Sequence, residues 1–168
     1  MEIKEQLKEM FQMQRTLNEN ILNEFGKKVM TEEKLELAIF DELGELTHEL
    51  KGEWCWWKKS QKPVDRKRVL EELVDVYHFV MTSEMERRYS STDEVIDRIL
   101  NKYEFSINHF DELEKERLDH LISDISYSYY KLTVLLQLTK CLQFSFDEIY
   151  QEYLNKNKIN YERLKNGY

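Results

Sequence analysis

Glycine, proline and cysteine are scarce in this sequence of 168 residues. Four glycines and one proline leave few sites for turns, while leucine, glutamate, lysine and glutamine are plentiful and favour helices. The two cysteines, Cys55 and Cys141, form no CxxC pair and have no histidine-rich segment beside them, which excludes a recognisable zinc site or disulfide framework. We therefore expect an all-α protein with reduced thiols.

Long apolar runs and excess positive charge are also missing. No stretch of 18 apolar residues occurs, and the N-terminal segment is charged at every second or third residue, so neither a membrane span nor a signal peptide is expected. The 33 acidic residues outnumber the 25 basic ones, and a net charge of −8 repels the phosphate backbone of a duplex. These absences predict a cytoplasmic protein that binds neither membrane nor nucleic acid.

Apolar residues that recur at steps of three and four predict five or six helices, packed as an antiparallel bundle in a single domain over residues 1–168. Ser91 with Glu94 and Ser145 with Glu148 are spaced as capping boxes that begin two of these helices. The tryptophan-rich segment 52–68, which holds the only proline, is expected to be the main loop. The expected helices cover about 3–25, 31–51, 65–88, a shorter one from 91, 113–142 and a last one from 145.

Four acidic residues carry the main functional signal. Glu42 and Glu45 are three apart on one predicted helix, Glu72 and Asp75 are three apart on the next, and each pair flanks an apolar stripe. If the stripes pack together, the four carboxylates converge, and two such charges 4 Å apart repel by about 4 kcal/mol at an effective dielectric constant near 20. Oxygen-only ligands suit Mg²⁺ or Mn²⁺, ions that also bind phosphate oxygens. The alternative is a solvated acidic surface in a chain that is 35% charged.

Several motifs resemble those of a known family. ExxE at 42–45 and ExxD at 72–75 are similar to the metal site of all-α NTP pyrophosphatases, which the MazG-type proteins share. Further segments narrow the resemblance to the dimeric all-α dUTPases. They are QxxLN at 14–18, the tryptophan-rich loop that closes in Trp57 and Lys58, DxxHF at 75–79, and YxxKNxxNxxRxxxGY at 153–168. Together they span nearly the whole chain.

The resemblance implies a homodimer that hydrolyses dUTP to dUMP and pyrophosphate, which limits uracil incorporation into DNA and supplies dUMP. It implies that the four acids are the catalytic residues and hold Mg²⁺, with Mn²⁺ as a substitute. The residues that it implies for substrate binding are Gln14, Asn18, Trp57, Lys58, His78, Lys156, Asn160 and Arg163. Exposed aromatic residues such as Tyr127, Tyr129 and Tyr130 offer a dimer interface.

Some of these residues have a second interpretation. Gln14 replaces an apolar residue in a helical stripe, with Asn18 one turn later, so both could be core amides bonded to another helix. His78 could be a bonded core histidine, and the tryptophans could anchor the loop instead of stacking on a base. In contrast, Lys156, Asn160 and Arg163 form one stripe of hydrogen-bond donors, which suits an anion.

Two other functions compete with dUTP hydrolysis. A related all-α pyrophosphohydrolase for dCTP or non-standard nucleotides would share the acidic quartet, so the residues that face the nucleoside decide between the two enzymes. A non-catalytic helical interaction module would leave the acids merely solvated. His48 with Glu49 departs from the Asn-Glu pair that the family often has, which leaves the role of His48 open.

Overall fold

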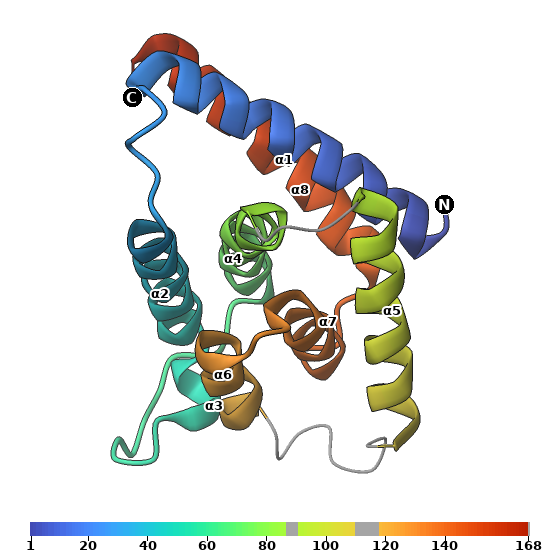
Figure 1. Cartoon of the computed structure of the whole chain (residues 1–168). Coiled ribbons are helices and arrows are strands. Elements are labelled where there is room, and N and C mark those ends of the chain that lie inside the picture. Colours follow the sequence, from blue (N-terminus) through green and yellow to red (C-terminus); the bar gives the residue numbers. More distant parts are fainter. Residues whose placement is uncertain (87–90, 110–117, 168) are drawn as a thin grey trace.

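Helices make up all the regular secondary structure in the residues that the computed structural model describes, 1–86, 91–109 and 118–167 (Figure 1). The all-α prediction is confirmed, with eight helices in these residues where five or six were expected. The helices are α1 (Ile3–Phe25), α2 (Glu32–Glu49), α3 (Lys51–Trp54), α4 (Arg66–Glu86), α5 (Thr92–His109), α6 (Leu118–Tyr127), α7 (Lys131–Cys141) and α8 (Phe146–Asn166).

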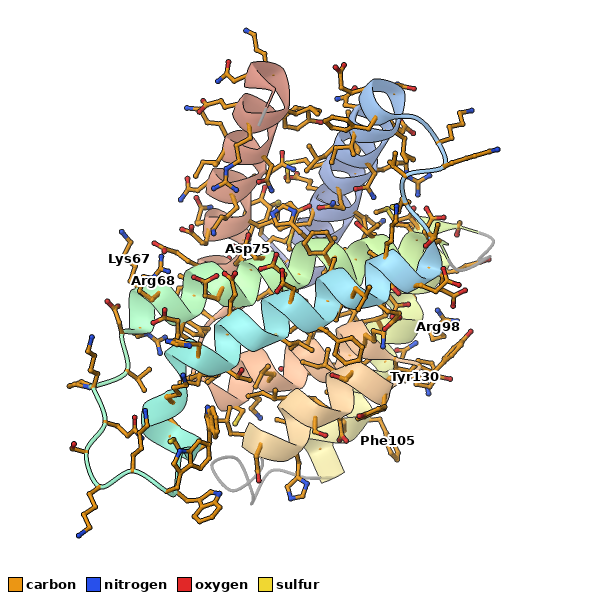
Figure 2. All side chains as sticks on the ribbon, turned by 90° about the vertical axis from the view of Figure 1, so that its left-hand side faces the viewer. Lys67, Arg68, Asp75, Arg98, Phe105 and Tyr130 are labelled. Atoms are coloured by element: carbon orange, nitrogen blue, oxygen red, sulfur yellow. The ribbon has the colours of Figure 1, made fainter. Side chains whose placement is uncertain are left out.

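Packing of α2 against α4 builds the centre of the fold. The two helices run side by side and antiparallel (Figure 2), and their apolar stripes face each other in the core. Leu43 and Leu46 of α2 and Leu73 and Val76 of α4 are at most 4% exposed. Burial of each such side chain stabilises the fold by roughly 1.5–3 kcal/mol, so this contact is strong. α1 and α8 pack along each other on one side of the pair (Figure 1).

The helix ends follow the capping signals. At Ser145 the side chain and Glu148 form the reciprocal capping box that the spacing predicts. Ser91 Oγ likewise accepts a hydrogen bond from the backbone N–H of Glu94 at 3.2 Å, and Thr31 caps α2 by accepting from the N–H of Lys34. From this start α8 continues without a break to Asn166, so the whole donor stripe lies on one helix. None of the described helices is both long and apolar enough to cross a membrane.

The prediction of one long helix over residues 113–142 is wrong. α6 ends at Tyr127 and α7 begins at Lys131, while residues 113–117 lie outside the described part of the chain. Lys131 explains the break: its side chain is 4% exposed, and its Nζ donates to the carbonyl oxygens of Ile125 and Ser126, which end α6. Carbonyls of a last helical turn have no partner within their own helix, and this lysine supplies one. The other addition is α3, a single turn at the start of the expected loop.

The α6–α7 junction yields a stability prediction. Lys131 also forms an ion pair with Glu36 of α2 at 3.2 Å. Lys131→Met should lower the free energy of unfolding by about 1 to 3 kcal/mol, because it leaves buried carbonyl groups without a donor. Urea unfolding followed by circular dichroism measures the change. Lys158→Met, at an exposed position of α8, is the control and should shift the midpoint little; equal midpoints in both variants would contradict the assigned role.

Candidate active site

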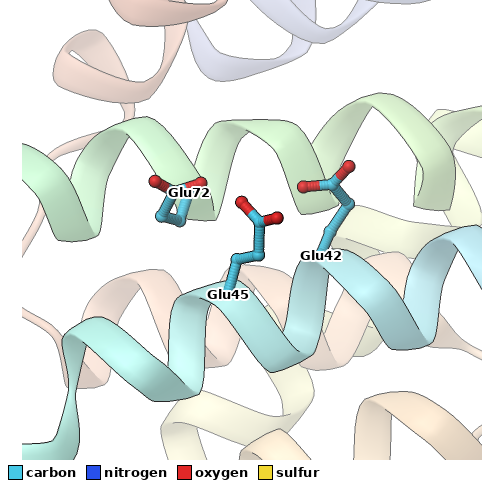
Figure 3. Close-up of side chains that lie close together, drawn as sticks. All are labelled: Glu42, Glu45 and Glu72. Atoms are coloured by element: carbon cyan, nitrogen blue, oxygen red, sulfur yellow. The ribbon is translucent and has the colours of Figure 1, made fainter.

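Four carboxylates from α2 and α4 line a pocket of about 630 Å³. Glu42, Glu45 and Glu72 each offer one oxygen, and these oxygens lie within 4.8 Å of one another (Figure 3). The antiparallel packing of two helices, each with acids at i and i+3 beside its apolar stripe, brings them together. A set of oxygen ligands held this closely on rigid helices fits a hard divalent cation.

Two basic side chains reach into this acidic cluster. Lys156 of α8 places its Nζ 2.5 Å from Oδ2 of Asp75, the fourth acid of the quartet. Arg68, one turn before Glu72 on α4, donates to Glu72 at 2.9 Å and to Glu71 at 2.8 Å. Each base thus offsets part of the repulsion among the acids, and both line the pocket.

Burial shifts the pKa of three of the four acids upward. It raises the pKa of Glu42 from 4.5 to about 7, and the negative charges of Asp75 and Glu45 add to the increase. Burial also raises the pKa of Glu72 and of Asp75, although Lys156 opposes both shifts. A cation bound among these groups would favour their charged forms and relieve the repulsion. The electrostatics therefore agree with the ligand geometry in favouring a divalent metal here.

A network of neutral hydrogen bonds lies farther along the same pocket. Gln14 of α1 is 4% exposed and has a protein partner at every hydrogen-bonding position of its amide. Its Nε2 donates to Asn18 Oδ1 at 2.9 Å and to Thr82 Oγ1 at 3.2 Å. Its Oε1 accepts from the hydroxyl of Tyr153 and lies 2.6 Å from Nδ1 of His78. The contacts of Gln14 are thus those of a core amide that also lines the pocket.

His78 is a neutral, buried member of this network. Its ring stacks on that of Tyr153 with 4.3 Å between centroids. Burial lowers the pKa of His78 to about 3, and the charge of Lys156 adds to the decrease. Because the oxygen of Gln14 can only accept, Nδ1 of His78 carries the proton. Nε2 is then an acceptor, and it has no hydrogen-bond partner in the described residues.

The pocket has an acidic end and a neutral end. On α4 the acids come first, and His78, Phe79 and Thr82 follow in the next turns. Because α2 is antiparallel to α4, its first half lies beside these neutral residues, and it contributes Leu35, Ala38 and Lys34 there. The Nζ of Lys34 donates to the carbonyl of Val29, so this end is neutral apart from that one side chain. Apolar side chains of α1 and of residues 29–30 complete this lining. A ligand with a polyanionic part and a flat, weakly polar part matches this division.

The structure brings most of the predicted site residues together. Those that line the pocket are Gln14, Asn18, Glu42, Glu45, Glu72, Asp75, His78, Lys156, Asn160 and Arg163. Trp57 and Lys58 do not line it. Trp57 is 55% exposed and packs edge to face against Trp54, whose Nε1 donates to the carbonyl of Thr47. These contacts agree with the loop-anchor interpretation of the tryptophans.

Three residues of the site were not singled out for it by the sequence. Arg68 falls at the end of the expected loop 52–68, although its i, i+4 spacing to Glu72 is a usable signal. Thr82 follows His78 at i+4 and returns a hydrogen bond to its carbonyl at 2.9 Å. Tyr153 appeared only as the first letter of the C-terminal motif. Its contact with Gln14 joins residues 139 positions apart, which no local spacing reveals.

An acidic quartet on two antiparallel helices, next to a pocket with cationic and neutral linings, defines the chain as an all-α nucleoside triphosphate pyrophosphohydrolase. The sequence matches the family described as dUTPase over residues 6–168, essentially its whole length, and the chain belongs to this family. No curated protein matches the sequence. The enzyme is therefore a dUTP diphosphatase, and dUTPases of this kind depend on a divalent metal.

The raised pKa of Glu42 makes the stability of the metal-free protein depend on pH. The pKa of Glu42 is about 7 in the folded protein, against 4.5 in the unfolded chain. The contribution of protonated Glu42 to the free energy of unfolding is therefore fully present below pH 4.5 and is lost as the pH rises through about 7. In EDTA, the free energy of unfolding should fall by roughly 1 to 2 kcal/mol between pH 5 and pH 8. This energy is smaller than the full pKa shift implies, because solvent screens a partly exposed group. Glu42→Gln should flatten this slope, whereas exposed Glu19→Gln should keep it. A slope that survives Glu42→Gln would refute the assignment.

Proposed function

We propose that Glu42, Glu45, Glu72 and Asp75 hold Mg²⁺, with Mn²⁺ as a substitute, and that they are the catalytic residues for dUTP hydrolysis. The observation that carries this proposal is the cluster of three carboxylate oxygens within 4.8 Å of one another in a pocket that also contains cationic side chains. When bound, the metal would neutralise charge on the triphosphate and polarise its phosphoryl oxygens.

The reaction adds water and breaks the oxygen bridge between the α- and β-phosphates, so that dUMP and pyrophosphate leave. Glu42 would orient the attacking water and accept its proton. Support comes from its half-buried position within the carboxylate cluster, where a deprotonated carboxylate can accept a proton from water. Lys156, Asn160 and Arg163 would bind phosphate oxygens and balance the charge of the departing pyrophosphate.

The neutral end of the pocket would hold the nucleoside. Asn18 and His78 offer hydrogen-bonding groups there, Gln14 supports them, and Phe79 adds an aromatic face. Apolar lining with a few fixed polar groups suits a base and a deoxyribose. Trp57 and Lys58 would act on substrate only if the loop moved or if a second copy of the chain brought them to the pocket, since they lie outside it here.

We also propose that the enzyme is a homodimer. Tyr127 and Tyr129 are 85% and 58% exposed near the α6–α7 junction, and Leu37 and Phe40 are 66% and 45% exposed on the outer side of α2. Exposed aromatic and aliphatic side chains of this size are common where two copies associate. Light scattering of the purified protein would measure its mass in solution, and a monomer at micromolar concentration would contradict the proposal.

The direct test of the function is pyrophosphate release from a panel of nucleotides in the presence of Mg²⁺. We expect dUTP to be the preferred substrate over dCTP and dTTP. Glu72→Gln or Asp75→Asn should reduce turnover at least about a thousandfold and weaken metal binding, yet leave the helix content unchanged, because each removes one member of a repelling cluster. The matched control is Glu71→Gln, a neighbouring carboxylate that does not line the pocket. Preference for dCTP would favour the related pyrophosphohydrolase instead.

The C-terminal donor stripe gives a separate prediction. Arg163→Gln or Lys156→Met should lower kcat by about tenfold to a hundredfold, since each removes one charge-assisted bond to phosphate of roughly 1.5 to 3 kcal/mol. Lys165→Met, an exposed residue on the same helix, should leave kcat within about twofold. Steady-state kinetics with saturating Mg²⁺ measures kcat for each variant. Wild-type kcat in the Arg163 and Lys156 variants would mean that the stripe is structural.

A further inference from the structure

The amide of Gln14 is held in one orientation by residues of two other helices. Tyr153 of α8 is fully buried, and its hydroxyl donates to Gln14 Oε1 at 2.6 Å. Burial raises the pKa of this hydroxyl, so it stays a donor. With the oxygen facing Tyr153 and His78, the NH₂ group of Gln14 must face the opposite side. Reversing the amide would deprive Tyr153 and His78 of their shared acceptor.

The orientation of Gln14 determines that of Asn18. Gln14 Nε2 donates to Asn18 Oδ1 at 2.9 Å, while Asn18 Nδ2 donates to Thr82 Oγ1 at 3.1 Å. The single hydroxyl proton of Thr82 goes to the carbonyl of His78 at 2.9 Å, so Oγ1 is free to accept. Asn18, which is half-buried and lines the pocket, keeps one N–H and one oxygen lone pair beyond these bonds, each on a fixed side.

An amide that is held in one orientation can distinguish uracil from cytosine. Uracil presents a donor at N3 beside an acceptor at O4, whereas cytosine presents an acceptor at N3 beside a donor at N4. An amide with its oxygen and its nitrogen on set sides pairs with one order and leaves its groups unpaired against the other. Sites of this kind reject the wrong partner strongly, because unpaired buried polar groups are costly.

We propose that Tyr153 is a positioning residue that selects uracil over cytosine. Its hydroxyl holds Gln14, and Gln14 holds the amide of Asn18 in the orientation that pairs with uracil. Tyr153 itself does not line the pocket, so it acts only through these two residues. The inference rests on the proposed placement of the nucleoside at the neutral end of the pocket.

Tyr153→Phe tests the relay, because it removes the hydroxyl and keeps the ring that stacks on His78. The ratio of kcat/KM for dUTP to kcat/KM for dCTP should fall about tenfold. Tyr150→Phe is the matched control: Tyr150 lies one turn earlier on α8, and its hydroxyl donates to Glu9. That variant loses a comparable hydrogen bond outside the pocket and should keep the wild-type ratio. A ratio that stays the same in Tyr153→Phe, or that falls equally in both variants, would overturn the proposal.

A spectroscopic readout separates this proposal from the assigned substrate. In the wild type, ¹⁵N NMR should find His78 protonated at Nδ1, and Tyr153→Phe should raise the fraction protonated at Nε2, because a reversed Gln14 offers His78 a donor. This measurement needs no nucleotide. If the wild type does not hydrolyse dUTP but the tautomer shifts, the proposed function fails and the relay stands. An unchanged tautomer together with an unchanged ratio refutes the relay alone.

If Tyr153→Phe does not fold, Gln14→Glu tests whether the orientation of Asn18 controls the preference for uracil. A carboxylate at position 14 accepts from Tyr153, His78, Asn18 and Thr82, and it would turn the NH₂ group of Asn18 toward itself. The relay then predicts a reversal, in which dCTP gains on dUTP by more than the tenfold change expected of Tyr153→Phe. Retention of the wild-type preference in a folded Gln14→Glu protein would rule out control of the base by the Asn18 orientation.

Discussion

The packing of α2 against α4 is the contact on which the rest of the molecule depends, because it holds like charges together. Burial of Leu43, Leu46, Leu73 and Val76 contributes roughly 1.5 to 3 kcal/mol for each side chain. Two carboxylates at 4 Å repel by about 4 kcal/mol in a partly solvated site. The apolar contact of these four side chains therefore outweighs the repulsion of one such pair, and Lys156 and Arg68 offset part of the rest. The remaining repulsion contributes to the raised pKa of Glu42.

α8 joins the two ends of the pocket. Tyr153 contacts the neutral network and Lys156, three residues later on nearly the same face, contacts Asp75 of the acidic cluster. A movement of this helix would therefore disturb the hydrogen bonds of Gln14 and the neutralisation of Asp75 at the same time. The capping box at Ser145 fixes the beginning of the helix, and the donor stripe lies toward its other end. Under the proposed placement of the substrate, binding of a triphosphate at the stripe would thus tighten the nucleoside site.

Features that depend on one helix were predictable from the sequence, whereas features that depend on contacts between distant helices were not. Spacing along α2 and α4 predicted the four acids, because i and i+3 fix a shared face. The break before Lys131 was not predicted, because apolar periodicity continues across it. Only the hydrogen bond from Lys131 to the carbonyl of Ile125 in the folded protein reveals it. The bonds of Gln14 to Thr82 and Tyr153 span 68 and 139 residues, so their pairing is set by how the helices are rotated in the bundle.

The separation of a charged end from a neutral end explains how one pocket can combine affinity with selectivity. All nucleoside triphosphates carry the same phosphates, so under the proposed function the acidic end with a bound metal would supply binding and chemistry but no choice of nucleobase. The choice needs groups whose charge does not change near the acids. Burial meets this need by keeping His78 neutral, with a pKa of about 3, and by surrounding Gln14 with partners. A charged residue within the hydrogen-bond network of Gln14 would trade the directional preference of neutral hydrogen bonds for a nonspecific attraction.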